Sequence, residues 1–227
     1  MYPLSVRKKS LYQYFLKGRD PISSMTHFIG AVCSVVLTLL MLFVCIFIRH
    51  LSLGTNLSLL IFGLSLIALY SASAYYHFIQ TTPEREARFR KVDHAMIYVL
   101  IAGTYTPLCL YFMPPGHGLA FISIMWAIAL VGIVVKIFWM SAPRWFSTAI
   151  YLLMGWAIIF DLKAFQGVPL ACLALIAAGG IAYSVGAVMY IFKKPNPFPM
   201  LGFHELFHLF ILLGSFLHFL AVFIFIV

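Results

Sequence analysis

The stretch "MTHFIGAVCSVVLTLLMLFVCIFI", residues 25–48, contains no Lys, Arg, Asp or Glu. At about 1.5 Å per residue, a helix of this length exceeds the roughly 30 Å of hydrocarbon in a bilayer. The rest of the chain has the same character, since 63% of its 227 residues are hydrophobic and only 9% are charged. A soluble protein carries about 25% charged residues. The sequence therefore predicts an all-α, polytopic membrane protein.

Further apolar runs follow along the chain, separated by Pro, Gly and basic residues that typically end helices. They predict a bundle of seven transmembrane helices at about residues 25–48, 57–79, 93–112, 119–140, 147–165, 169–192 and 202–226. Asp20-Pro21 is a helix-start signal in front of the first run. We expect a single domain over residues 1–227. Its segment 1–24 is cytoplasmic and includes an interfacial amphipathic helix at "SLYQYFLKG", residues 10–18.

The distribution of Lys and Arg predicts how the bundle is oriented. If the seven spans alternate in direction, thirteen of the fifteen basic residues fall on one side, and only Arg49 and Lys163 fall on the other. Because basic residues accumulate in cytoplasmic loops, the N-terminus is expected in the cytoplasm and the C-terminus outside. The same distribution explains the net charge of +9, so we expect no nucleic-acid partner.

Many ionisable side chains are predicted to share one depth, near the cytoplasmic face. Spans one, three and seven begin there and span two ends there, and these helix ends carry His27, His77, Asp93, His94, His204, Glu205 and His208. Carboxylates and unpaired polar groups are costly in or beside hydrocarbon. A shared polar site explains this clustering better than composition does.

The spacing of the histidines favours a metal site. His204 and His208 are four residues apart, so their imidazoles lie on one helix face, one turn apart. His77 can supply a third ligand, and three histidines with an open fourth position are typical of a catalytic zinc. Asp93 is then a candidate to accept a proton from metal-bound water or to orient that water. Ser73, one turn from His77, is a candidate donor to an oxyanion.

Two other interpretations of the histidine pair stay open. Residues 204–208 have the H-E-x-x-H spacing of zinc peptidases, in which Glu205 would be the general base. However, no Asp or Glu follows Glu205, and His218 lies roughly 15 Å farther along the helix than His208. An intramembrane protease is therefore the weaker hypothesis. The pair can also occur at a helix start without any metal, and Glu205 would there favour the positive helix N-terminus.

Several motifs together resemble the hemolysin III family. They are "SAYYH" at residues 73–77, "VDHAMIY" at 92–98, "LIAGTYTP" at 100–107, "YLLMGW" at 151–156, "GGIAYSVGAVMY" at 179–190, "HELFHLF" at 204–210 and "GSFLHF" at 214–219. The resemblance covers about residues 22–225. This family is grouped with the progestin and adipoQ receptors and, more distantly, with alkaline ceramidases. Its bacterial members often carry a carboxylate shortly before the position of His27, whereas residues 22–26 contain none.

The resemblance implies a seven-helix bundle with the N-terminus inside. It also implies a zinc ion held by His77, His204 and His208, with Asp93 interacting through the metal-bound water and Ser73 nearby. In relatives the last two histidines are spaced H-x-x-x-H with variable middle positions. Glu205 would then be incidental to the metal site.

The resemblance implies three kinds of function. The receptor relatives indicate hydrolysis of a lipid amide such as ceramide, the family name indicates haemolysis or pore formation, and a third possibility is a non-enzymatic regulator of membrane homeostasis with a structural zinc. A pore needs a continuous polar lining, but the outer halves of the spans are nearly all apolar. We therefore expect a zinc-dependent hydrolase of the bacterial cell (inner) membrane. It would act on the amide or ester of a membrane lipid at the cytoplasmic side.

Overall fold

A computed structural model describes residues 10–227 of the chain. Arg7, Lys8 and Lys9, which contribute to the predicted orientation, lie outside the described residues. The described residues form the helices α1 (Leu11–Phe15), α2 (Pro21–Phe43), η1 (a π-helical turn, Val44–Ile48), α3 (Leu53–Phe78), α4 (Pro83–Phe112), α5 (Pro115–Phe138), α6 (Arg144–Gly155), η2 (a 3-10 helix, Ala157–Phe165), α7 (Leu170–Phe192) and α8 (Phe203–Phe225). Seven helical segments are long and apolar enough to cross a membrane, which confirms the all-α, seven-helix prediction.

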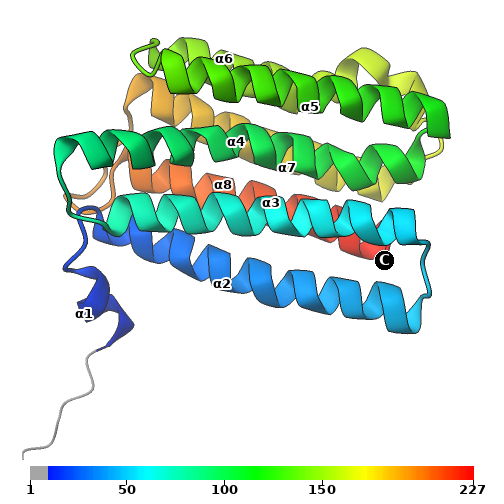
Figure 1. The fold of residues 1–227 in the computed structure, drawn as a ribbon, viewed down its shortest axis with the longest axis horizontal. Helices are drawn as coiled ribbons and strands as arrows, with labels where there is room; N and C mark the ends of the chain where they lie inside the picture. The colour runs from blue at the N-terminus through cyan, green and yellow to red at the C-terminus, as the bar shows by residue number, and fades with distance from the viewer. Residues whose placement is uncertain (1–9) are drawn as a thin grey trace, which may run out of the picture.

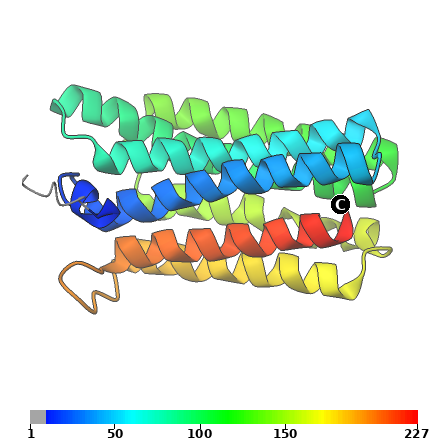
Figure 2. The ribbon, with the colours of Figure 1, turned by 90° about the horizontal axis from the view of Figure 1, so that it is seen from below.

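Successive long segments alternate in direction within a single bundle (Figure 1). Neighbours in sequence pack side by side from α2 to α5 and from α6 to α8, and α8 also packs against α2 (Figure 2). The last helix of the bundle therefore lies beside the first. We call the end at which α2, α4, α6 and α8 begin the histidine end of the bundle.

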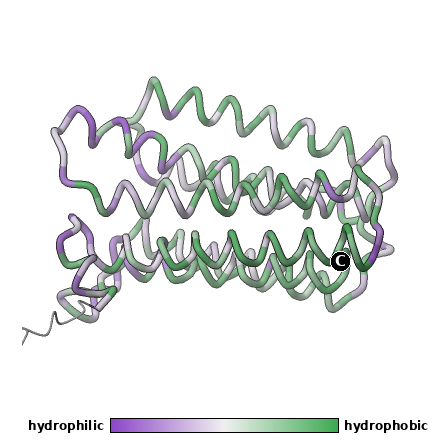
Figure 3. Tube along the Cα trace, turned by 60° about the horizontal axis from the view of Figure 1, so that its bottom comes forward, coloured by the Kyte–Doolittle hydropathy of each residue, from purple (hydrophilic) through white to green (hydrophobic). Residues whose placement is uncertain are grey.

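Hydropathy along the trace agrees with a membrane position. Apolar residues fill most of the helical shafts, and hydrophilic residues gather in the connections at both ends (Figure 3). Large apolar side chains such as Leu39, Phe47 and Leu130 are exposed on the outside of the bundle. An exposed apolar surface of this kind is costly in water but matches the hydrocarbon of a bilayer.

Local sequence explains where the helices begin and where one of them changes form. Pro21, Pro83 and Pro115 stand in the first turns of α2, α4 and α5, where a missing N–H costs nothing. Helix α4 begins at Pro83, ten residues before the expected start of the third span at residue 93. The expected fifth span is not one α-helix, since α6 ends at Gly155 and continues as η2.

Glycines bring α7 and α8 close together. A side-chain carbon at Gly179 would lie 2.5 Å from the imidazole of His218, and one at Gly214 would lie 2.7 Å from the ring of Tyr183. Small residues at such positions let two membrane helices approach closely enough to pack well. This close packing fixes the position of α8 against α7, and α8 contains two of the predicted metal ligands.

Candidate metal centre

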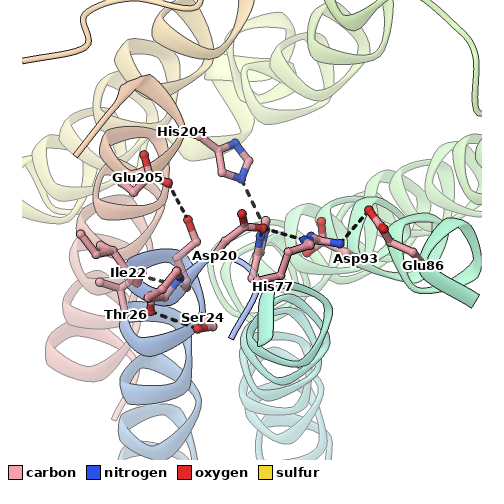
Figure 4. A network of polar contacts seen from close by, with 12 residues as sticks. Asp20, Ile22, Ser24, Thr26, His77, Glu86, Asp93, His204 and Glu205 are labelled. Atoms are coloured by element: carbon pink, nitrogen blue, oxygen red, sulfur yellow. Dashed lines mark hydrogen bonds and ion pairs between the residues drawn. The ribbon is translucent and has the colours of Figure 1, made fainter. Parts of the chain in front are cut away.

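Three histidines from two helices converge at the histidine end of the bundle. His77 lies in the last turn of α3, and His204 and His208 lie in the first two turns of α8. Each offers a ring nitrogen, and these three nitrogens lie within 4.8 Å of one another. Nε2 of His77 and Nε2 of His204 are 3.4 Å apart, and Figure 4 shows the two rings pointing toward each other.

The geometry of this histidine cluster fits a zinc ion. Two nitrogens bound at about 2.0–2.1 Å to one tetrahedral zinc lie about 3.4 Å apart, and Nε2 of His77 and Nε2 of His204 are separated by that distance. His208 is buried, and its Nδ1 has no hydrogen-bond partner among the described residues. A cation among the rings would bring the lone pairs of three imidazole nitrogens together at this spacing.

Asp20 orients His77 and was missed by the sequence reasoning. Oδ2 of Asp20 lies 2.8 Å from Nδ1 of His77. Since a carboxylate can only accept, Nδ1–H of His77 is the donor, and the lone pair of Nε2 is left facing the cluster. Histidine ligands of metals commonly donate their other ring N–H to a carboxylate in this way. The sequence signal at this position is the dipeptide Asp20-Pro21, which predicts a helix start but no contact with His77.

Arg19 continues this chain of charges. Its Nε donates to Oδ2 of Asp20 at 3.0 Å, and its guanidinium lies 2.7 Å from Oε1 of Glu86 on α4 (Figure 4). Burial alone would raise the pKa of Asp20, but the hydrogen bonds from His77 and Arg19 outweigh it and hold that pKa below its ordinary value. Asp20 is thus kept ionised, as a hydrogen-bond acceptor for His77 requires.

The histidine cluster opens into a cavity of about 840 Å³ inside the bundle. The two predicted catalytic residues, Ser73 and Asp93, line this cavity together with the three histidines. Asp93 is paired with Nδ1 of His94 at 3.3 Å. The structure thus brings all five predicted site residues to one cavity, although they come from α3, α4 and α8.

The cavity changes character along its length. On α7 its wall extends from Tyr190 near the histidine end to Leu173 near the opposite end, which is about 25 Å at the rise of an α-helix. The part far from the histidines is lined mainly by apolar side chains, among them Leu162, Leu173 and Ile158. One polar end and a long apolar end suit an amphiphilic molecule.

His27 forms a wall of the cluster, although the ligand prediction did not include it. Its ring is stacked on that of His208 with centroids 3.7 Å apart, and it is 3% exposed. Neither ring nitrogen of His27 has a hydrogen-bond partner within residues 10–227. Its stacking holds the ring of His208 in place from the side of α2.

Glu205 faces away from the histidines. Its Oε2 accepts a hydrogen bond from the backbone N–H of Gly202 at 2.9 Å, which caps the start of α8. Its Oε1 accepts from the hydroxyl of Ser23 on α2 at 3.2 Å (Figure 4). One oxygen thus caps α8 and the other links α8 to α2, and this arrangement argues against the general base of a zinc peptidase.

If the protein has the zinc and the lipid hydrolysis that the sequence predicts, replacing Glu205 by Gln should leave both near wild type, because Gln keeps the helix cap. Loss of a true general base would slow turnover by about 10²- to 10⁴-fold. The measurement is the rate of lipid hydrolysis beside the zinc content of the same preparation. A fall of about 100-fold with zinc retained would restore the peptidase-like role of Glu205.

Comparison with known proteins agrees with the motifs. A family model described as "Haemolysin-III related" matches residues 15–219. The chain is 35% identical over 201 residues to the "Hemolysin-3" of Bacillus cereus, and the match covers 88% of each chain. It is 38% identical over 195 residues to the "Hemolysin-3 homolog" of Bacillus subtilis (strain 168), covering 85% of this chain and 87% of that relative. With its seven membrane-spanning helices, the chain is a multi-pass cell-membrane protein that belongs to the hemolysin III family.

Proposed function

We propose that this protein is a zinc-dependent hydrolase that cleaves an acyl amide or ester bond of a membrane lipid. The observation that carries the proposal is the joining of two features in one cavity. The three-histidine cluster and Asp93 lie at the polar end of a cavity that extends about 25 Å along α7, and its far part is mainly apolar. A lipid can place its scissile carbonyl at the polar end while its chain fills the apolar end.

His77, His204 and His208 are the residues that would hold the metal. Zinc bound by three histidines supplies Lewis acidity and makes water at its open position titrate near neutral pH. Asp20 keeps His77 in the tautomer whose Nε2 faces the cluster. The stacking of His27 limits the rotation of His208.

Asp93 and Ser73 are the groups proposed to move and stabilise charge. Asp93, as a carboxylate in the cavity, is suited to accept the proton that water must lose before it attacks a carbonyl carbon. Ser73 can donate its hydroxyl hydrogen to the oxygen that gains negative charge. In the net reaction one water is consumed. Its OH joins the acyl carbon, and its remaining hydrogen goes to the nitrogen or oxygen that leaves.

We also propose that this site lies on the cytoplasmic side. The basic residues Lys17, Arg19, Arg85, Arg88, Arg90, Lys91, Arg144, Lys193 and Lys194 all lie at the histidine end of the bundle. Lys and Arg are retained in cytoplasmic loops, so this end is the one expected inside the cell. The substrate would then come from the inner leaflet.

A second candidate function is haemolysis, with a zinc ion that only stabilises the fold. The name "Hemolysin-3" of the Bacillus cereus relative favours it. A pore, however, needs polar groups from one face of the membrane to the other. The far part of the cavity is lined mainly by side chains such as Leu162 and Leu173, which favours a bound lipid chain over a water path.

The test of the proposed function is release of fatty acid by the purified protein. Ceramide and a phospholipid, each labelled in the acyl chain, are incubated with zinc-loaded protein in neutral detergent. We expect labelled fatty acid from at least one substrate, loss of the activity with a chelator, and its return when zinc is added. Absence of release from both substrates by folded, zinc-loaded protein would contradict the proposal.

A further inference from the structure

Three cations at the histidine end of the cavity form no ion pair with the described residues. Lys136 of α5 lines the cavity, is only 4% exposed, and donates from Nζ to the hydroxyl of Ser147 on α6 at 2.5 Å. Arg90 of α4 and Arg144 of α6 are exposed and line the same cavity. Among residues 10–227, none of these three cations takes part in an ion pair.

The carboxylates that line the cavity are already paired. Asp20 and Glu86 both contact Arg19. Asp93 contacts His94. None of these three carboxylates lies within ion-pair distance of Lys136, Arg90 or Arg144.

Of the three cations, Lys136 is the one whose charge is most costly without an anion, because it is buried. An ammonium has three N–H donors, and the contact with Ser147 uses one of them. A buried charge is costly unless an opposite charge and further hydrogen bonds compensate it. Because Lys136 is buried by protein, its ammonium does not reach water by extending along the membrane surface. An anion that enters the cavity would meet both requirements, because Lys136 lines the cavity.

The positions of the three cations match the level of lipid headgroups. Trp139 and Trp145, in and just after the connection between α5 and α6, are 49% and 60% exposed. Tryptophans with exposed rings collect at the boundary between hydrocarbon and water. Arg90 lies three residues before Asp93 on α4, so it stands about one turn nearer the surface than the proposed catalytic carboxylate.

We propose that the mouth formed by Lys136, Arg90 and Arg144 binds the phosphate of an anionic lipid headgroup, with Lys136 as the central contact. Binding of the lipid phosphate does not depend on the proposed function. The further claim that the hydrolysed substrate is an anionic phospholipid rests on that function. Its acyl carbonyl would lie about one turn deeper, near Asp93 and the histidines. Inorganic phosphate and sugar phosphates offer the same oxygens, but the apolar channel behind the mouth favours a lipid.

The experiment compares three probes on the full chain in neutral detergent. They are dioctanoyl phosphatidic acid, dioctanoylglycerol, which has the same chains without phosphate, and glycerol 3-phosphate, which has the phosphate without chains. Dissociation constants are measured by titration calorimetry. We expect phosphatidic acid to bind roughly 10- to 100-fold more tightly than either of the others, since hydrogen bonds between charged groups are strong.

Lys136→Met is the decisive variant, because Met has a similar length and no charge. It should weaken phosphatidic acid roughly 10- to 100-fold and leave dioctanoylglycerol unchanged. Without lipid, the variant should unfold at the same temperature as wild type or higher, since it removes an uncompensated buried charge. A lower unfolding temperature with unchanged lipid affinity would show a structural role for Lys136 and overturn the proposal.

Arg85→Gln is the matched control, since Arg85 is exposed on the same end of α4 but does not line the cavity. Equal losses in Arg85→Gln and Lys136→Met would mean nonspecific attraction and contradict a built site. If Lys136→Met does not fold, Arg144→Gln tests the same mouth from an exposed position. Glycerol 3-phosphate binding as tightly as phosphatidic acid would overturn the lipid assignment. Because binding is measured without turnover, failure of the hydrolase proposal is seen separately.

Discussion

Purified wild-type protein is expected to contain about one zinc per chain, and His208→Ala is expected to contain almost none after gel filtration. Nitrogens of His77, His204 and His208 lie within 4.8 Å of one another, so each occupies a coordination position that neither of the others can fill. Losing even an outer partner of a metal ligand lowers metal affinity by about 10- to 100-fold. Removal of a direct ligand should exceed that loss.

The measurement is metal content by mass spectrometry of protein prepared without a metal-affinity tag. His117→Ala is the control, because His117 is exposed at the opposite end of the bundle, where it contacts Asp161. This variant should keep its zinc. Well-folded wild type without zinc, or His208→Ala with a full complement, would contradict the proposed metal centre. The histidine cluster would then be a polar network without metal.

Asp93→Asn is expected to lower the rate of lipid hydrolysis by about 10²- to 10⁴-fold, the usual contribution of a general acid or base. Asn has the shape of Asp and no charge, so the fold and the zinc content should stay near wild type. The contact between Asp93 and Nδ1 of His94 can persist through the amide oxygen. The quantities to measure are kcat, KM and zinc per chain on the same sample.

Asp161→Asn provides the comparison for Asp93→Asn, since it also removes one carboxylate but lies at the far end of the bundle. Its hydrolytic rate should change little. Full turnover in Asp93→Asn would exclude Asp93 as the proton acceptor. Loss of zinc together with activity would instead make Asp93 a fourth ligand, as a closed structural site requires.

Much of the architecture could be predicted from residues close together in sequence. The bilayer requires each span to be apolar and about 20 residues long, so runs such as residues 25–48 reveal the number of helices directly. The i, i+4 spacing of His204 and His208 is likewise a property of one helix. The form of the fifth span was not predictable in this way, because α6 and η2 share one apolar run.

The sequence by itself determined the fold class, the seven helices and the five candidate site residues, since each depends on hydrophobic length, helical period or a family motif. Only the tertiary structure decided which side chains meet between helices. Asp20 and His77 are 57 residues apart and form a 2.8 Å contact. Lys136, one of the thirteen basic residues counted on the cytoplasmic side, is buried beside Ser147. Such pairs depend on how each helix is rotated and packed against its neighbours, which the pattern along one helix does not specify.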